Sequence, residues 1–247
     1  GRLSGTVIVD AIADTLTTRA PRITIRSGLP YYLSLSRDEC NVAGWAVDGV
    51  ENALTAIVTD SMGNPVAEGT AVYFYTNSGL IVGSDVTDTS GFAHSTWYSS
   101  DPRPPGGLVW VRAETRGAGT SVVLDSVSFF STYTVDSLWV EGVPDSIYAN
   151  TSATKTLIIH GFDLNDNPVV DTTSITLSTD LGTVTSPITT SGECSDSRAT
   201  ATYTSTTLSY DNFPSVGDFR GDMTVVNIRS GYTSIAVSYT HLTLPTN

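Results

Sequence analysis

Residues 54–66 read LTAIVTDSMGNPV, and residues 157–169 read LIIHGFDLNDNPV. Both stretches end an apolar run with an aspartate and close on Asn-Pro-Val, and Asp60 and Asp163 are 103 positions apart. A pattern that returns at a fixed distance indicates a repeated structural unit, and about one hundred residues is the size of a small domain. The sequence therefore predicts two copies of one domain.

Apolar and polar residues alternate within each copy. Residues 72–75 read VYFY and residues 175–178 read ITLS, again at the offset of 103. A period of two is that of a β-strand, whose side chains point alternately to opposite faces. We therefore expect Phe74 and Leu177, with the residue two positions before each, to lie in a core. Turn residues such as 77–79 (NSG) separate the strands at the short spacing of a β-sandwich.

Composition narrows the fold class and the partners. Acidic residues outnumber basic ones, 25 to 12, for a formal net charge of −13, and Lys155 is the only lysine. Nucleic acid and anionic membranes both require clustered basic residues, so we expect neither as a partner. No run of about 18 uncharged apolar residues exists, so we expect no membrane insertion. The abundance of Ser, Thr, Val and Tyr favours an all-β protein.

A third, partial copy is found at the N-terminus. Residues 5–11 (GTVIVDA) match residues 107–113 (GLVWVRA), and residues 221–227 (GDMTVVN) close the last repeat in the same way. We therefore expect residues 1–27 to be the last two strands of a truncated preceding domain. The chain opens without an initiating Met or a signal peptide, so we expect any targeting segment to lie outside it.

Two full domains then cover residues 28–130 and 131–239. No Gly/Ser-rich or Pro-rich linker separates them, so we expect a tandem arrangement, end to end, as a semi-stiff rod. Residues 240–247 (THLTLPTN) are unlike any part of the repeats and resemble translated adapter sequence, so we expect them to be a non-native tail.

These residues resemble a known family. The run at 54–66, together with residues 69–74 (GTAVYF), 87–93 (TDTSGFA) and 107–113, is similar to the bacterial immunoglobulin-like domains of invasin and intimin type. The resemblance implies an extracellular Greek-key β-sandwich, usually present in many copies on a bacterial surface protein. It implies a spacer or stalk within an adhesin, with neighbouring immunoglobulin-like domains of the same chain as partners.

Two alternatives of function remain open at this stage. One sandwich itself binds a host or cell-surface receptor or a glycan, or the repeats form a non-catalytic module appended to a secreted hydrolase. Tyr73 and Tyr75 are the candidate ligand-binding residues, because they alternate with core residues and should point outward, where aromatic side chains anchor partners. Cross-strand packing on a solvated face is the simpler interpretation. The sequence does not sort the tryptophans at 45, 97, 110 and 139 into core and surface.

The loop at 163–168 (DLNDNP) matches a string that calcium-binding cadherins carry at domain junctions. Ca²⁺ prefers carboxylate and amide oxygens, which makes Asp163, Asn165 and Asp166 candidate ligands. The first copy, 60–65 (DSMGNP), lacks the second acid, and one loop supplies only part of the 6–8 oxygens that Ca²⁺ needs. A tight turn is therefore the favoured interpretation of both copies.

The remaining reactive residue types give no catalytic pattern. Cys40 and Cys194 fall in different repeats, and we expect free or intermolecularly paired thiols rather than a mutual bridge. The histidines at 94, 160 and 241 lie in no catalytic or metal-binding motif, and we expect His94 and His160 to be solvated strand residues. We therefore expect no enzymatic activity.

Overall fold

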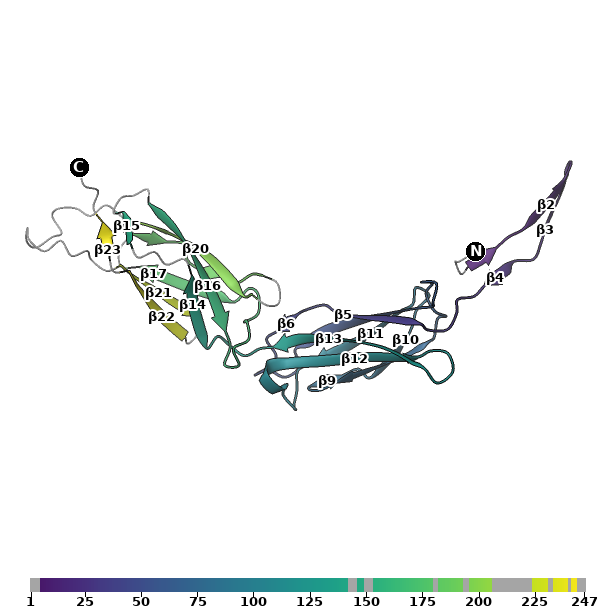
Figure 1. Ribbon diagram of the computed structural model, residues 1–247, viewed down its shortest axis with the longest axis horizontal. Coiled ribbons are helices and arrows are strands. Elements are labelled where there is room, and N and C mark those ends of the chain that lie inside the picture. Colours follow the sequence, from purple (N-terminus) through teal and green to yellow (C-terminus); the bar gives the residue numbers. More distant parts are fainter. Residues whose placement is uncertain are drawn as a thin grey trace, which may run out of the picture. The chain divides into compact units, whose positions relative to one another are not determined.

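The computed structural model describes the chain over residues 5–141, 146–148, 153–179, 182–192, 196–205, 224–230, 233–239 and 241–243 (Figure 1). Side chains are described up to residue 205, except at 146–148. Regular structure in these ranges is β-strand apart from one 3₁₀ turn, η1 (Pro105–Gly107), so the expected all-β class is confirmed. Within the same ranges, no helix has the length and apolar character to cross a membrane.

The chain divides into two compact units. The first comprises Gly1–Cys40 and Val47–Phe129, and the second comprises Asn41–Ala46 and Phe130–Asn247. The first unit begins with an antiparallel hairpin in which β2 (Asp10–Ala13) pairs with β3 (Leu16–Arg19) and β1 (Gly5–Val7) pairs with β4 (Ile23–Ile25). All residues of these four strands are exposed.

The rest of the first unit is a β-sandwich. One sheet has the strand order β5-β7-β11-β9, and the other has β10-β8-β12-β13. The short β6, which belongs to the second unit, runs parallel to the last two residues of β13. The strands are β5 (Tyr32–Arg37), β6 (Asn41–Val42), β7 (Glu51–Thr59), β8 (Ala71–Thr76), β9 (Leu80–Ile81), β10 (Ser84–Val86), β11 (Phe92–Tyr98), β12 (Leu108–Arg116) and β13 (Val122–Ser131).

The core of this sandwich is built from the inward positions of the alternating strands. Phe74 is 2% exposed, and Val72 is fully buried beside it, as the period of two predicts. Trp97 is also fully buried; its ring meets Phe129 edge-on with centroids 5.1 Å apart, and its indole N–H donates to the Ser78 carbonyl at 2.8 Å. The hydrogen bond satisfies the one polar group of Trp97, so burial of this large side chain stabilises the fold.

A glycine recurs beside the buried aromatic residue in both units. Gly79 has φ +66°, and a Cβ there would lie 2.7 Å from Trp97 Nε1. Gly182 has φ +77°, and a Cβ there would lie 2.9 Å from the Tyr203 hydroxyl. Both positions require a left-handed backbone and no side chain, which gives the repeated glycine one physical cause.

The second unit repeats the two sheets, in the orders β14-β16-β20-β18 and β19-β17-β21-β22. Its core includes Leu157, Ile159, Ile175, Leu177 and Tyr203. The strands are β14 (Ser137–Glu141), β15 (Ser146–Tyr148), β16 (Thr154–Phe162), β17 (Ser174–Thr179), β18 (Thr183–Val184), β19 (Ile188–Thr189), β20 (Arg198–Thr204), β21 (Thr224–Ser230), β22 (Thr233–Tyr239) and β23 (His241–Thr243).

The strand bounds follow the sequence repeat closely but not everywhere. β7 and β16, β8 and β17, and β9 and β18 all start 103 residues apart. In the closing strands, Ala113 lies opposite Phe74 and Ile228 lies opposite Leu177. Ile228 therefore corresponds to Ala113. The sequence alignment of residues 107–113 with 221–227, which places Asn227 at that position, is wrong by one residue. The chain between β17 and β21 is one residue longer than that alignment implies.

One short parallel pairing involves the C-terminal segment. β15 pairs in parallel with β23, as β6 does with the end of β13. β23 lies within residues 240–247, the segment expected to be non-native. The pairing of β23 is seen in the backbone, and the non-native origin of residues 240–247 stays a prediction.

Candidate functional site

The outward face of β8 carries two tyrosines. Tyr73 and Tyr75 are 43% and 44% exposed, between core residues that are buried. The structure thus places both candidate ligand-binding residues on the solvent side of the sheet, two positions apart on one strand. In the second unit the equivalent positions hold the small side chains of Thr176 and Ser178, so the two units differ at this point.

The neighbouring strand β12 orients these rings. Arg112 lies opposite Tyr75, with its guanidinium carbon 4.9 Å from the centre of the Tyr75 ring. The Tyr75 hydroxyl donates to Glu114 Oε1 at 3.1 Å, and Arg112 lies 3.4 Å from the same carboxylate. The hydrogen bond to Glu114 raises the pKa of the Tyr75 hydroxyl, because ionised phenol would face a carboxylate. These contacts hold the Tyr75 ring in one orientation.

Trp110 extends the same surface along β12. It is exposed, and its neighbours Val109 and Val111 are buried, so alternation alone could have placed it outward. The same sheet also carries exposed Val86 on β10 and exposed Leu124 on β13. We refer to the outward residues Tyr73, Tyr75, Trp110, Arg112 and Glu114 as the aromatic face.

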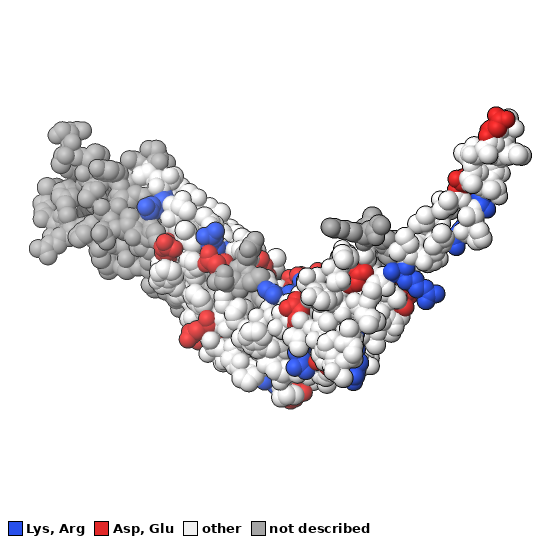
Figure 2. Space-filling model, turned by 45° about the vertical axis from the view of Figure 1, so that its right-hand side comes forward, with Lys and Arg blue, Asp and Glu red and all other residues white. Residues whose placement is uncertain are grey.

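The aromatic face has the chemistry of a contact surface. Flat rings offer apolar area for stacking on a sugar ring or for anchoring a protein side chain, and they lose little conformational entropy on binding. Arg112 and Glu114 add one donor group and one acceptor group beside the rings. Elsewhere, charges of both signs are scattered over the visible face in Figure 2, and no large patch of one sign is seen there.

The second unit presents a different aromatic pair. Trp139 on β14 is exposed, and its ring lies 5.0 Å from that of His160 on β16. His160 Nδ1 lies 3.0 Å from Asp196 Oδ1, and Nε2 lies 3.5 Å from Glu141 Oε2. The expectation that His160 is a solvated strand residue is therefore wrong, because its side chain is only 12% exposed. In the first copy Ile57 stands at this position, so the repeat gives no signal for the cluster.

The loop expected to be a turn or a calcium site closes around one carboxylate. Asp163 is buried, and its Oδ1 accepts the backbone N–H groups of Asn165 and Asn167 at 2.8 and 3.0 Å. Its Oδ2 accepts the backbone N–H of Tyr133 at 3.1 Å. Both carboxylate oxygens therefore already have hydrogen-bond donors, which is the arrangement of an Asx turn.

The other two candidate calcium ligands lie at the rim of this turn. Asp166 is exposed and has φ +60°, at the position where Gly63 has φ +79° in the first copy. Asn165 is half-buried. Over the ranges with described side chains, no group of three or more His, Cys, Asp or Glu residues could hold a metal ion. Calcium binding by Asp163, Asn165 and Asp166 stays a prediction.

The first copy of the loop is built in the same way. Asp60 Oδ1 accepts the N–H groups of Met62 and Asn64 at 2.8 and 2.9 Å, and Oδ2 accepts the N–H of Gly28 at 2.9 Å. The pKa of Asp60 is lowered to about 2, chiefly by the hydrogen bond from the Gly28 N–H. The hydrogen bonds from Asn64 and Met62 add to this effect, and together they outweigh desolvation, which alone would raise the pKa. We refer to the pairs Asp60–Gly28 and Asp163–Tyr133 as the aspartate clamps.

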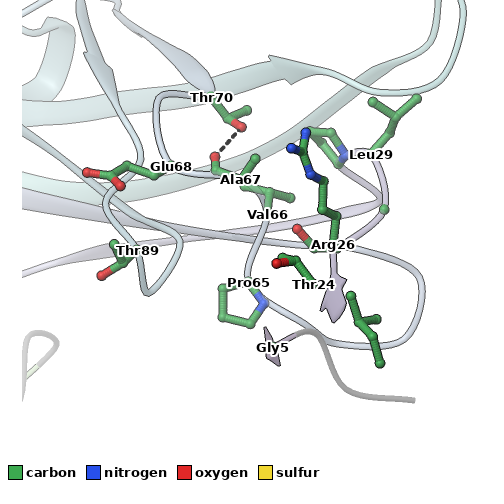
Figure 3. A pocket seen from close by; sticks show the side chains of 14 residues that line it. Gly5, Thr24, Arg26, Leu29, Pro65, Val66, Ala67, Glu68, Thr70 and Thr89 are labelled. Atoms are coloured by element: carbon green, nitrogen blue, oxygen red, sulfur yellow. Dashed lines mark hydrogen bonds between the residues drawn. The ribbon is translucent and has the colours of Figure 1, made fainter. Parts of the chain in front are cut away.

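An open hollow of about 670 Å³ lies beside the first aspartate clamp (Figure 3). Thr24 and Arg26 line one side of it, and Pro65, Val66 and Glu68 line the other. Within its wall, Thr70 Oγ1 donates to the Ala67 carbonyl at 2.6 Å.

The cysteine and the remaining histidine have ordinary structural contacts. Cys40 is disulfide-bonded, and the described residues contain no free cysteine. The expected free thiol is thus wrong for Cys40, because the sequence carries no signal for pairing between distant cysteines; Cys194 lies outside the described residues. His94 Nδ1 lies 3.3 Å from Thr55 Oγ1 on the adjacent strand.

Several solved structures are similar to this chain. No protein-family model matches the chain, and no curated protein matches it. The D0–D1 domain of intimin is 23% identical, over 86% of this chain and 95% of that one, with a TM-score of 0.33. Invasin, a bacterial integrin-binding protein, is 21% identical, over 85% and 39%, with a TM-score of 0.34. Domains 4 and 5 of the S-layer protein SbsC are 16% identical, over 56% and 66%, with a TM-score of 0.32.

A glycosyl hydrolase family 2 member is 11% identical, over 85% of this chain and 24% of that one, with a TM-score of 0.33. This chain spans 39% of the invasin structure and 66% of the SbsC structure. The strand order of the sheets and the two cores define an all-β protein of immunoglobulin-like sandwich class.

Proposed function

We propose that this chain is a structural and adhesion module, a set of spacer or stalk repeats from a large bacterial cell-surface or secreted adhesin-like protein. The aspartate clamps carry this proposal. In each unit a buried aspartate binds the backbone of the segment that leads into the sandwich, at Gly28 or at Tyr133. A segment fixed by hydrogen bonds has less freedom than a flexible linker, which suits a domain that must hold a distance.

The same unit is suited to bearing load. Seven residue pairs join β7 to β11, and seven join β16 to β20, as antiparallel ladders at the centre of their sheets. The neighbouring immunoglobulin-like domains of the chain are then its first partners. A protein with this task works by the geometry of its repeats, and it needs neither cofactor nor catalytic group.

An extracellular location agrees with the chemistry of the chain. Cys40 is disulfide-bonded, and disulfides persist mainly in oxidising surroundings outside the cytosol. The net charge of −13 favours solubility and disfavours binding to nucleic acid. These features support a place on the bacterial cell surface or in the secreted fraction.

Small-angle X-ray scattering tests the spacer function. Under reducing conditions the wild-type chain should scatter as one extended particle with a narrow spread of dimensions. Asp163→Ala should broaden that spread, because the Tyr133 N–H loses its acceptor, while Asp166→Ala should not, because that side chain is exposed and outside the clamp. A wild-type chain as broadly distributed as Asp163→Ala contradicts the spacer function.

The aromatic face favours a second function, direct binding of a receptor or a glycan. The double variant Tyr73→Ser/Tyr75→Ser removes both rings, and Leu80→Ser, an exposed apolar position on the other sheet, is the matched control. Cell adhesion unchanged in both variants supports the spacer. Adhesion lost only in the tyrosine variant, with an unchanged melting temperature, supports the binding function.

The third candidate function is that of a non-catalytic module in a secreted hydrolase. The sequence of the complete gene distinguishes it from a stalk. Further repeats would support the stalk, and a catalytic domain would support the hydrolase module.

A further inference from the structure

The N-terminal hairpin has one apolar face. The pairing register places Val7 opposite Ile23, and Ala13 opposite Leu16. Opposite residues of an antiparallel pair share a face, and so do residues two apart on one strand. The apolar face therefore has two stretches: Val7, Ile23 and Ile25 with Gly5 on β1 and β4, and Ala11, Ala13 and Leu16 with Thr18 on β2 and β3. Exposed Ile8 and Val9 lie between the two stretches.

The opposite face of the hairpin is polar. Thr6 lies opposite Thr24, and Asp10 lies opposite Arg19, with which it forms an ion pair at 2.7 Å. Among the paired positions of this face, Ile12 alone is apolar. A strand pair with one apolar and one polar face is the pattern of a sheet that covers a core on one side only.

No part of the described chain covers the apolar face. Val7, Ile23 and Leu16 are 38%, 52% and 77% exposed. The hairpin strands form two-stranded sheets of their own, and Figure 1 shows β1 to β4 as a purple ribbon with no other strand paired to them. An isolated two-stranded hairpin is at best marginally stable in water, so this face calls for a partner.

The repeat identifies what such a face contacts. Val7 and Ala11 correspond, at an offset of 102, to Val109 and Ala113 of β12, and both of those residues are fully buried in the first sandwich. Ala13 corresponds to Thr115, which is also buried. The positions that face solvent in the hairpin are thus core positions in the complete copy.

The aspartate clamp gives a second, independent correspondence. β4 ends at Ile25, three residues before Gly28, and β13 ends at Ser131, two residues before Tyr133. The hairpin therefore precedes the clamp of the first unit as β12 and β13 precede the clamp of the second.

We infer that residues 5–25 are the closing strand pair of a further immunoglobulin-like sandwich, whose other strands come from chain on the N-terminal side of Gly5. The direction follows from the first unit, in which β8, the partner of β12, precedes it in the chain. The occupant of the apolar face is then a part of the same polypeptide. This inference goes beyond the proposed function and does not depend on it.

Hydrogen exchange on two chains tests this inference. One is the 247-residue chain, and the other carries in addition the ~80 residues that its gene encodes before Gly1, about the length that precedes the closing strands in a domain of this size. In the longer chain, the backbone N–H groups of β2 and β3 should exchange at least ~100-fold more slowly, because a sandwich would now protect them.

Substitutions on the two faces make the test specific. In the longer chain, Val7→Asp should lower the melting midpoint of the added domain by ~10 °C or more, because it buries an unpaired charge. Thr6→Asp, on the polar face of the same strand, should leave that midpoint unchanged. Val109→Asp is the positive control, because it should lower the melting midpoint of the first unit in the same way. In the 247-residue chain, Val7→Asp should leave the melting of both units unchanged.

Three results would overturn the inference. The first is equal exchange of β2 and β3 in the two chains, and the second is a preceding gene sequence without strand-forming pattern. The third is a dimer of the 247-residue chain that Val7→Asp abolishes, because a second copy would then be the occupant of the apolar face.

Discussion

Asp60 Oδ2 accepts a hydrogen bond from the backbone N–H of Gly28 at 2.9 Å, across 32 residues of chain, and Asp163 Oδ2 accepts one from Tyr133 at 3.1 Å, across 30 residues. The other oxygen of each carboxylate closes the turn that follows it. One aspartate therefore shapes a loop and fixes the segment that enters the sandwich. This double role explains why the aspartate recurs while residues between it and Asn-Pro differ.

The first clamp predicts a specific acid sensitivity. The pKa of Asp60 is lowered to about 2, so its stabilising contribution is fully present above the ordinary aspartate value of about 3.9 and is lost as the pH falls through the folded value. We predict that the urea midpoint of the wild type falls more steeply between pH 4 and pH 2 than that of Asp60→Asn. Circular dichroism at pH 4, 3 and 2 measures this.

Asp38→Asn, which changes an exposed aspartate of the same unit, is the control for this experiment. The urea midpoint of Asp38→Asn should fall as steeply between pH 4 and pH 2 as that of the wild type. Equal slopes for the wild type and Asp60→Asn would show that the clamp does not stabilise the folded state.

Alanine substitutions at two glycines distinguish the cost of a left-handed backbone from the cost of a steric clash. Gly79→Ala should destabilise the first unit by ~3 kcal/mol or more, because the new methyl group meets Trp97 and the left-handed backbone is unfavourable for alanine. Gly63→Ala should cost ~1 kcal/mol, because its φ is +79° but nothing lies within 4 Å of the new Cβ. Urea denaturation gives both values, and equal costs would refute the crowding at Gly79.

The aromatic face predicts an unusual tyrosine. The hydrogen bond to Glu114 raises the pKa of Tyr75, so absorbance at alkaline pH should show a late component that comes from the ionisation of Tyr75. Tyr75→Phe should remove this late component, and Tyr73→Phe should retain it. Because the pair is exposed, Tyr75→Phe should change the urea midpoint only slightly. A titration unchanged by Tyr75→Phe contradicts the hydrogen bond.

The turn at Asp163 predicts little effect of calcium. Its carboxylate oxygens already accept three backbone N–H groups, so a chelator should leave the melting temperature unchanged. A cation that bound only the folded state would stabilise it by ~2.7 kcal/mol at a hundred times its dissociation constant. A clear rise in melting temperature with calcium, abolished in Asp166→Asn, would instead support the calcium interpretation.

The sequence predicted what depends on local pattern. Alternation placed Phe74 and Leu177 inside and Tyr73 outside, and the period of 103 predicted matching strands. Contacts between distant segments left no such pattern. The Gly28 donor is a backbone N–H, which every residue except proline has, so no residue type marks it. The carboxylates around His160 come from Glu141 on β14 and from Asp196, two residues before β20, and the first copy has Ile57 in place of His160.

The repeat encodes two β-sandwiches with separate cores, and native-state hydrogen exchange of Phe74→Ala measures whether the cores are separate. Removing this buried ring should cost ~3–5 kcal/mol. We expect β7, β8, β11 and β12 to lose protection by that amount while β16, β17 and β20 keep theirs. An equal loss in both sets of strands would mean one shared core and would refute the division into two sandwiches.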